Sequence, residues 1–268
     1  MNQPTDLPDV NSPQVSLILP AHNEELRLPD TLHRYLREFK ARYGEAFEVV
    51  VVCNGCTDAT VALAHAWAHR WTQLRVLNIP QAVGKGAAVL AGFRAARAPQ
   101  LLFADADAAT EASSLFELLD SLQGHDVIIG SRRLPDSVIV RPQPPLRRLS
   151  GGGFAWLVRR LFQLPYRDTQ CGAKAFRREA ALLLADRVTE ARWTFDLDLL
   201  LQARSLGLTV QEQPVVWTDR EGSQLRMWST AQQVTHSLWQ LKRRQSGVRP
   251  RRATWRPTRP AGQAETGG

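Results

Sequence analysis

The sequence places two carboxylates, Asp105 and Asp107, on alternate residues directly after the apolar run Leu101 to Ala104. If this run is a β-strand, both side chains leave its carboxyl end and can approach one point. Carboxylate oxygens suit a hard divalent cation, and Mg²⁺ or Mn²⁺ held there would keep coordination positions open for phosphate oxygens. The alternative is a pair of solvated surface acids, which match the same spacing. The position of the pair after an apolar run favours a metal site.

Lys85, between Gly84 and Gly86, is a third residue with the chemistry of a phosphate site. The segment is similar to the end of a phosphate-binding loop, but the upstream glycine and the following Ser or Thr of a Walker motif are missing. No G-x-G-x-x-G follows the first predicted strand, so a nicotinamide-binding domain is a poor match. We expect Lys85 to reach a phosphate, with a solvated loop lysine as the alternative.

Cys53 and Cys56 have the C-x-x-C spacing of a redox pair or of half a zinc site. A structural zinc site needs two further ligands at suitable spacing, and the chain offers only Cys171 and scattered histidines. A redox pair usually opens a helix after a strand, which this pair could do. We favour the interpretation that both cysteines line a strand-to-helix turn.

The elements that must position these residues alternate between strand and helix. Hydrophobic periodicity predicts strands at 15–20, 48–53, 74–79, 100–104 and 126–130, and helices at 24–43, 57–71, 87–96 and 113–122, the second of them capped by Thr57. This alternation is typical of an α/β fold with a doubly wound, mostly parallel sheet. Ligands of such sheets bind outside the carboxyl ends of the strands, where this chain carries polar residues at 21–24, 53–58, 105–107 and 131–133.

The pattern is less regular after residue 130. Four prolines predict a loop at 134–145, and a glycine triplet at 151–153 is expected to break a helix at 146–164. A turn and strand at 168–176, a helix at 195–205 and a strand at 208–217 follow. Residues 226–246 form an amphipathic pattern with Trp228, Leu238 and Leu241 on one face. We therefore divide the chain into a flexible N-terminus (1–12), a main domain (13–225), an amphipathic helix (226–246) and a basic disordered tail (247–268).

The formal charge of +8 suggests nucleic acid or an anionic membrane as a partner, but its distribution narrows the choice. Residues 241–268 hold eight basic residues and one acid, so they carry +7 and leave +1 for residues 1–240. A nearly neutral body speaks against a specific nucleic-acid partner. No apolar run approaches the length of a membrane span and no secretory signal is visible, so we expect a cytoplasmic protein. The amphipathic helix and the tail could hold it peripherally on the inner face of the cell membrane.

Several short blocks occur in an order that resembles the family-2 glycosyltransferases of GT-A fold. The blocks in the N-terminal half are 15–25, 50–58, 84–88, 105–110 and 130–132. Further blocks at 167–176, 192–200 and 217–223 are similar to those of dolichyl-phosphate β-glucosyltransferases, and related polyprenyl-phosphate hexosyltransferases share some of them. The resemblance covers about residues 13–245.

This resemblance implies an inverting transfer of a hexose, with glucose favoured, from a nucleotide sugar to a polyprenyl (dolichyl-type) phosphate. UDP-glucose is the expected donor and GDP-mannose the alternative. A Mg²⁺ or Mn²⁺ ion on Asp107, with Asp105 nearby, would stabilise the leaving nucleoside diphosphate. A second hypothesis is a family-2 enzyme acting on a hydroxyl of a cell-wall, lipid or soluble acceptor. A third is a membrane or nucleic-acid adaptor that uses the basic tail on an inactive fold.

The resemblance also assigns site residues. The catalytic group would comprise Asp105, Asp107, Arg132 and Asp196. The donor would be bound by Pro20, Ala21, Asn23, Glu24, Asn54, Lys85 and Asp105. The acceptor would be bound by Arg132, Arg147, Arg148, Ser150 and Gln170. A polyprenyl phosphate is already anionic, so it needs positive groups more than a base, and the fork of Arg132 is the first candidate. The alternatives are structural: Asp196 as a helix cap, and Arg147 and Arg148 as a solvated helix start.

Three departures from the family pattern concern the donor. Cys53 and Asn54 stand where many relatives carry two acids, one of which helps to hold the base or ribose. The choice between a uridine and a guanosine donor therefore stays open. His22 stands where an aromatic residue is common. Ala108 and Ala109 replace a glycine or polar residue after the second acid, which would leave the metal one protein ligand fewer.

Overall fold

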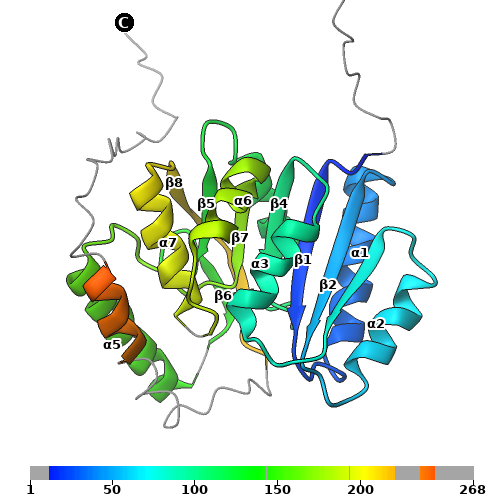
Figure 1. Cartoon of the computed structure of the whole chain (residues 1–268), viewed down its shortest axis with the longest axis horizontal. Helices are drawn as coiled ribbons and strands as arrows, with labels where there is room; N and C mark the ends of the chain where they lie inside the picture. Colours follow the sequence, from blue (N-terminus) through cyan, green and yellow to red (C-terminus); the bar gives the residue numbers. More distant parts are fainter. Residues whose placement is uncertain (1–11, 143, 193, 221–235, 245–268) are drawn as a thin grey trace, which may run out of the picture.

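The computed structural model describes residues 12–142, 144–192, 194–220 and 236–244. Its centre is a seven-stranded sheet in the order β3-β2-β1-β4-β7-β5-β8, with helices on both faces (Figure 1). The strands are β1 Val15–Ala21, β2 Phe47–Asn54, β3 Leu74–Ile79, β4 Gln100–Ala104, β5 Val127–Ser131, β7 Ala173–Arg177 and β8 Val210–Pro214. Only β7 runs against its neighbours, β4 and β5. The predicted α/β fold with a mostly parallel sheet is confirmed.

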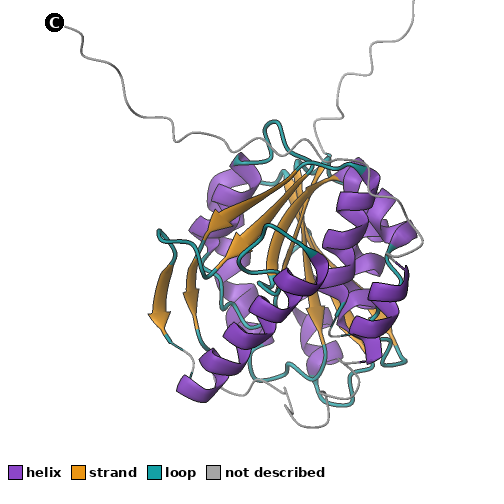
Figure 2. Cartoon of the chain, turned by 90° about the vertical axis from the view of Figure 1, so that its left-hand side faces the viewer, coloured by secondary structure: helices purple, strands orange, loops and turns teal. Residues whose placement is uncertain are grey.

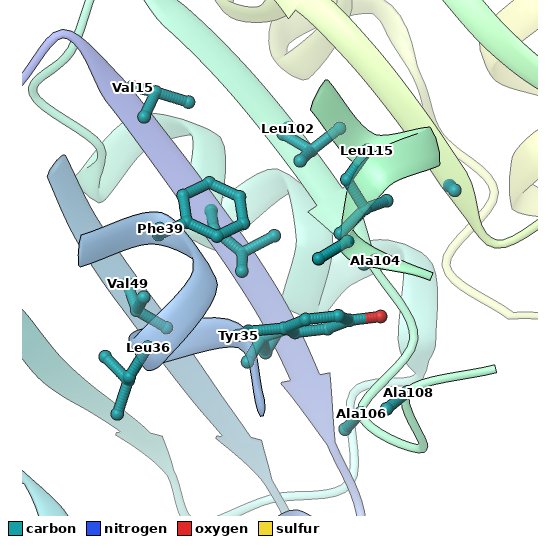
Figure 3. Close-up of a cluster of buried hydrophobic side chains, with 14 of the residues drawn as sticks. Val15, Tyr35, Leu36, Phe39, Val49, Leu102, Ala104, Ala106, Ala108 and Leu115 are labelled. Carbon is teal, nitrogen blue, oxygen red and sulfur yellow. The ribbon is translucent and has the colours of Figure 1, made fainter. Parts of the chain in front are cut away.

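Alternation along the strands divides the buried side chains into two cores. In β1, Leu17 and Leu19 join one core and Ile18 the other, and the valines of β2 divide in the same way. The first core is covered by α1 Leu28–Tyr43, α2 Thr60–Ala68 and α4 Ala112–Asp120. Figure 3 shows part of it, with Tyr35 and Phe39 of α1 over strands β1, β2 and β4. The second core is covered by α3 Lys85–Ala95, α5 Pro145–Phe162, α6 Arg178–Arg187 and α7 Phe195–Leu206.

A second, two-stranded sheet pairs β6 Val138–Arg141 with β9 Val216–Thr218 in parallel, and Figure 2 shows it beside the main sheet. The predicted loop at 134–145 is wrong at this strand. The prolines lie outside it, at 135, 142, 144 and 145, and they bound a short β-branched run rather than prevent it. The single strand predicted at 208–217 is likewise two strands, β8 and β9.

Three helix predictions need correction. The helix α5 runs without a break through the glycine triplet at 151–153, because packing of Val158 and Phe162 in the core stabilises it more than glycine weakens it. The helix α6 was not predicted, since its alanine and leucine positions carry no clear periodicity. Thr57 does not cap α2, which begins at Thr60; Asp58 Oδ1 accepts the Thr60 backbone N–H instead, at 3.0 Å.

Residues 236–244 are helical and lie beside α5 (Figure 1). Leu238 and Leu241 are buried in the same core as α5, and Lys242 Nζ donates to the Leu161 carbonyl at 2.7 Å. Trp239 and Arg243 are exposed, so the described part of this helix is amphipathic. The rest of the predicted helix, including Trp228, and the predicted tail lie outside the described residues, as do residues 1–11.

Candidate active site

The loops after β1 and β4 meet where the strand order reverses. β1 has β2 on one side and β4 on the other, so the chain leaves β1 in one direction and later returns to the opposite side. Ligand sites of open α/β sheets form at such a switch point. Glu24, after β1, lies close enough to Asp105 and Asp107, after β4, for the carboxylates to interact. Burial first and then these two acids raise the pKa of Glu24 to about 7, although Arg27 holds it in an ion pair of 2.6 Å.

Backbone contacts fix the two acids of the D-x-D pair. The Asp105 N–H donates to the Gly172 carbonyl at 3.0 Å, and Asp107 Oδ1 accepts the Ala109 N–H at 3.0 Å. Burial, and then repulsion from Asp105, raises the pKa of Asp107. A divalent cation would relieve this repulsion, and an all-oxygen donor pair suits Mg²⁺ or Mn²⁺. Within the described ranges, no group of three or more His, Cys, Asp or Glu side chains is placed to hold a metal, so a cation on this pair would need other oxygens as well.

Two lysines and two aspartates form a cluster over the ring of Phe103, which we call the lysine–aspartate cluster. Lys85 Nζ lies 2.5 Å from Asp105 Oδ1, and Lys174 Nζ lies 2.5 Å from Asp196 Oδ1. The two ammonium groups stand 5.6 and 5.3 Å from the Phe103 ring centre. Burial opposes the charge of Lys85, but Asp105 and Asp196 outweigh it and raise the pKa of Lys85. Lys85 is therefore a fixed cation beside the acidic pair.

Arg132 is held by a buried carboxylate. Its Nε and Nη2 donate to the two oxygens of Asp168 at 2.7 and 2.9 Å, and its backbone N–H donates to the same carboxylate at 3.1 Å. Its guanidinium also lies 5.4 Å from the ring centre of Trp217. Burial alone would raise the pKa of Asp168, but Arg132 lowers it to about 2. One edge of the Arg132 guanidinium, formed by Nε and Nη2, therefore binds Asp168. This contact fixes the orientation of the rest of the guanidinium.

Comparison with known proteins identifies the family of this chain. Residues 16–182 match the family described as glycosyl transferase family 2. The chain is 37% identical to the dolichyl-phosphate β-glucosyltransferase of Drosophila melanogaster, over 84% of this chain and 74% of that protein, and 34% identical to the human enzyme of the same name over the same shares. The chain belongs to glycosyltransferase family 2.

Solved structures show the same fold as this family-2 glycosyltransferase. Glucosyl-3-phosphoglycerate synthase from Mycobacterium tuberculosis, in complex with Mn²⁺, UDP and glucosyl-3-phosphoglycerate, superposes with a TM-score of 0.63 at 19% identity, covering 85% of this chain and 80% of that one. Staphylococcus aureus TarS in complex with UDP-GlcNAc superposes with a TM-score of 0.52 at 19% identity, covering 78% and 60%. The match is to the GT-A fold that the sequence predicted.

In this glycosyltransferase, the residues that are predicted to bind the nucleoside lie at strand ends and in loops that hydrogen-bond to one another. Pro20 and Ala21 end β1, and Asn23 Oδ1 accepts the Thr57 N–H at 2.8 Å. Asn54 Oδ1 accepts the Val83 N–H at 2.8 Å, so this side chain ties the end of β2 to the loop before α3. The Asn54 carbonyl in turn lies 2.7 Å from the Nδ1 of His22. These contacts fix the relative positions of the loops after β1 and β2 and of the loop before α3.

The predicted acceptor residues lie on the other side of the acidic pair. Gln170 stands between Asp168 and β7; its Nε2 is buried and, like Thr169 Oγ1, has no hydrogen-bond partner in the described part of the chain. Arg147, Arg148 and Ser150 belong to the first turns of α5, and their side chains lie outside what the structure describes. A Cβ on Gly151 would come within 3.5 Å of Arg133 Nη2, so α5 passes next to the arginine that follows Arg132.

The structure also shows residues that the sequence did not single out. Lys174 is fully buried, and its Nζ also donates to the Cys171 carbonyl at 2.6 Å. Its signal was present, since a lysine inside the apolar strand from 173 to 176 needs a buried partner. The partnership of Asp168 with Arg132 had no such signal, because 36 residues separate them.

Of the two cysteines that we expected in the strand-to-helix turn, Cys56 lies in the turn, whereas Cys53 lies in β2 and is buried in the first core. All three cysteines are free, and burial raises the pKa of the Cys53 thiol to about 12, which makes a reactive thiolate unfavourable. Cys56 Sγ lies 3.5 Å from the Ala21 carbonyl.

A separate cavity of about 330 Å³ lies between α1 and the start of α4, lined in part by Tyr35, Ala108 and Thr110. It is on the side of the sheet covered by the first core, whereas Asp105 points to the other side with the lysine–aspartate cluster. We therefore do not count this cavity as part of the candidate active site.

Proposed function

We propose that this glycosyltransferase moves glucose from UDP-glucose to a polyprenyl (dolichyl-type) phosphate, with inversion. The observation that carries the proposal is the position of Arg132, on its buried Asp168, beside an acidic pair and a fixed lysine. Such a site pairs a metal-binding donor end with a cationic acceptor end. The names of the relatives support it: the fly and human proteins are dolichyl-phosphate β-glucosyltransferases at 37% and 34% identity.

At the donor end, Asp105 and Asp107 would hold Mg²⁺ or Mn²⁺, which would supply positive charge for the leaving nucleoside diphosphate. Lys85, whose Nζ lies 2.5 Å from Asp105 Oδ1, would bind a phosphate oxygen of the donor. The nucleoside would lie on the loops of Pro20, Ala21, Asn23, Glu24 and Asn54. Complexes of the mycobacterial synthase with Mn²⁺ and UDP-glucose support this choice of metal and nucleotide. GDP-mannose is the alternative donor.

At the acceptor end, a phosphate monoester is already an anion at neutral pH, so positioning by cations is the main requirement. Arg132 offers the edge of its guanidinium that Asp168 does not use, and the buried Nε2 of Gln170 offers a further donor. Arg147, Arg148 and Ser150 at the start of α5 would complete the contact. Asp168 is a positioning residue here, because it acts through Arg132.

A family-2 enzyme acting on a hydroxyl acceptor is the second candidate, because Asp196 lies in the lysine–aspartate cluster and a carboxylate could act as a general base there. Its oxygen is already bound by Lys174, which favours a structural and electrostatic role. The substitution Asp196→Asn should abolish transfer to a hydroxyl but leave more of the transfer to a phosphate. The ratio of the two activities in one preparation separates the candidates even if some protein unfolds.

A donor screen tests the main proposal. The full chain is incubated with UDP-glucose or GDP-mannose, Mg²⁺ or Mn²⁺, and a short-chain polyprenyl phosphate, and the product is identified by mass spectrometry and its anomer by NMR. We expect a β-glucosyl phosphodiester from UDP-glucose, and its loss in Asp107→Asn. Transfer only to hydroxyl acceptors, or from no donor, would contradict the proposal.

We also propose the cellular setting and the domain limits. The transferase unit spans residues 13–225, and helix 226–246 with tail 247–268 would hold it peripherally on the cytoplasmic face of the cell membrane. No helix in the described ranges is long and apolar enough to cross a bilayer.

A further inference from the structure

Exposed apolar side chains gather at one end of the molecule. The described residues expose eight large hydrophobic side chains, and six of them lie on β6, on α5 or on the helix 236–244. The six are Val138, Ile139, Val140, Trp156, Leu157 and Trp239. Trp156 is 68% exposed and Trp239 is 54% exposed, so two large indole rings stand in water. Exposed apolar side chains that gather on neighbouring elements, such as α5 and the helix 236–244, mark an interaction surface.

The same end is strongly basic. Residues 137–167, which include β6 and α5, contain six arginines and no acidic residue. Residues 236–244 add Lys242, Arg243 and Arg244, again without an acid. Residues 1–240 carry a net charge of +1. Without the six arginines of 137–167, these residues carry −5, so the positive charge of the fold lies toward this end.

Both helices present the two kinds of side chain outward. On α5, Val158 and Phe162 are buried, whereas Trp156, Leu157, Arg159 and Arg160 face out. On the helix 236–244, Leu238 and Leu241 point inward, and the guanidinium of Arg243 lies 4.5 Å from the ring centre of the exposed Trp239. We call the outward residues Trp156, Leu157, Arg159, Arg160, Trp239 and Arg243, together with the valines of β6, the cationic apolar face.

This face is continuous with the acceptor end of the site. Lys242 Nζ joins the helix 236–244 to α5 through the Leu161 carbonyl, and α5 passes Arg133 at Gly151. In Figure 1, α5 lies at the left, toward the lower edge at which β1 and β2 end, and this left-hand side of the molecule faces the viewer in Figure 2. The helix that carries much of the face therefore also borders the residue next to Arg132.

We propose that the cationic apolar face is a docking surface for an anionic lipid bilayer. Tryptophan is favoured at the boundary between headgroups and acyl chains, because its ring is apolar and its N–H is polar. Arginine binds the phosphates of the headgroups, and each basic residue near an anionic surface adds about a fivefold gain in partitioning. A nucleic acid would match the arginines but leave the valines and Leu157 without a partner. The proposal rests on the proposed function in one respect: the acceptor proposed there is a lipid, which the enzyme reaches by binding to the bilayer.

Vesicle flotation of the full chain tests the docking. The vesicles contain phosphatidylcholine alone or with about a third phosphatidylglycerol. We expect binding to the anionic vesicles and about a tenfold lower partition coefficient for the double variant Trp156→Ser/Leu157→Ser. Arg159→Gln/Arg160→Gln should lower the coefficient by about 25-fold, at about fivefold for each arginine. The matched controls are Leu183→Ser on α6, and Arg37→Gln/Arg70→Gln at the far end; all these residues are exposed.

Circular dichroism and thermal unfolding confirm that each variant is folded, which is expected because every substituted side chain is exposed. Wild-type binding by both α5 variants would overturn the proposal, as would tighter binding to a DNA duplex than to anionic vesicles.

Activity separates this proposal from the proposed function. The α5 variants should keep transfer to a short, water-soluble polyprenyl phosphate and lose transfer to a long-chain one in vesicles. Vesicle binding without transfer to either acceptor would contradict the proposed function and leave the docking supported.

Discussion

Two pairs of charged residues with buried members fix candidate site residues. Asp168 holds the fork of Arg132, and Lys174 holds Asp196; Asp168, Lys174 and Asp196 are each less than a tenth exposed. An ionised group is stable in such a place only when a partner and hydrogen bonds replace the lost water. Removing one member therefore costs more than the pair contributes, because the other member stays buried and unpaired.

Asp168 gives a prediction with a defined pH dependence. Its pKa is about 2 in the folded chain and higher when unfolded, so its contribution to stability is complete above about pH 4 and is lost as the pH falls toward 2. We expect Asp168→Asn to lower the free energy of unfolding by about 3 kcal/mol at pH 7, and by roughly 2 kcal/mol at pH 3, where about half of the pH-dependent contribution is lost. Urea unfolding at both pH values measures this. The exposed Asp186→Asn should change stability by less than about 0.5 kcal/mol at pH 7, and an equal loss in both variants would refute the argument.

Lys174 gives a second prediction at this scale. In Lys174→Met, Asp196 would be buried without its cation, so we expect a loss of about 3 kcal/mol of stability. The double variant Lys174→Met/Asp196→Asn should recover part of it, because no buried charge remains unpaired. Chemical denaturation of the two single variants and the double variant gives the coupling energy. The exposed Lys40→Met serves as a control, and a purely additive double variant would contradict the pairing.

At the scale of elements, the sequence predicted the strands and helices whose formation depends on local hydrophobic periodicity. The strands at 74–79 and 100–104 have the predicted bounds, because each is a short apolar run between turns. The elements that the sequence did not predict correctly depend on tertiary contacts. The helix α5 continues through glycines because the core holds it, and β6 is a strand because β9 pairs with it. Neither partner is visible in the local sequence.

The candidate site divides in the same way. Asp105, Asp107 and Lys85 could be proposed from their positions after a strand and before a helix, and the structure brings Lys85 to within 2.5 Å of Asp105. Arg132 and Asp196 were proposed by resemblance, but the partners that orient them, Asp168 and Lys174, could not be found without the fold. The members of each pair lie 36 and 22 residues apart on different elements, so no spacing rule in the sequence connects them.

Gly172, just before β7, gives a prediction about how that element positions the acidic pair. A Cβ at this residue would stand 1.9 Å from Asp105 Oδ2, so Gly172→Ala must displace the carboxylate. We expect kcat/KM to fall about a hundredfold, with a weaker response to Mn²⁺ and little change in the circular dichroism spectrum. Steady-state kinetics over a Mn²⁺ series measures this.

The matched control for Gly172→Ala is Gly153→Ala. A Cβ on Gly153 meets nothing within 4 Å, and the residue lies inside α5. This variant should keep its kinetics and gain about 0.5 kcal/mol of stability, because alanine favours a helix. Unchanged kinetics in Gly172→Ala would show that the site tolerates a shifted Asp105.

At the scale of the whole molecule, the charge of +8 first suggested a nucleic-acid partner, and its distribution points elsewhere. The basic residues fall in two groups, the stretch 137–167 within the fold and the segment after residue 241. The first group lies around exposed tryptophans, and its inner end approaches Arg132 through Arg133 and Gly151. The charge and the apolar surface thus lie on the side of the candidate active site that holds Arg132, which suits the proposed acceptor in a bilayer.

Deletion of residues 247–268 tests whether the tail adds to this attraction without supporting the fold. Residues 247–268 contain only two large apolar residues, Val248 and Trp255, so we expect the midpoint of thermal unfolding to stay within about 2 °C of the full chain. The deletion removes five arginines and one glutamate. Binding to anionic vesicles should therefore weaken and depend less steeply on salt, whereas transfer to a soluble short-chain acceptor should not change. Flotation at two salt concentrations measures this, and a large fall in the unfolding midpoint would show that the tail packs on the body.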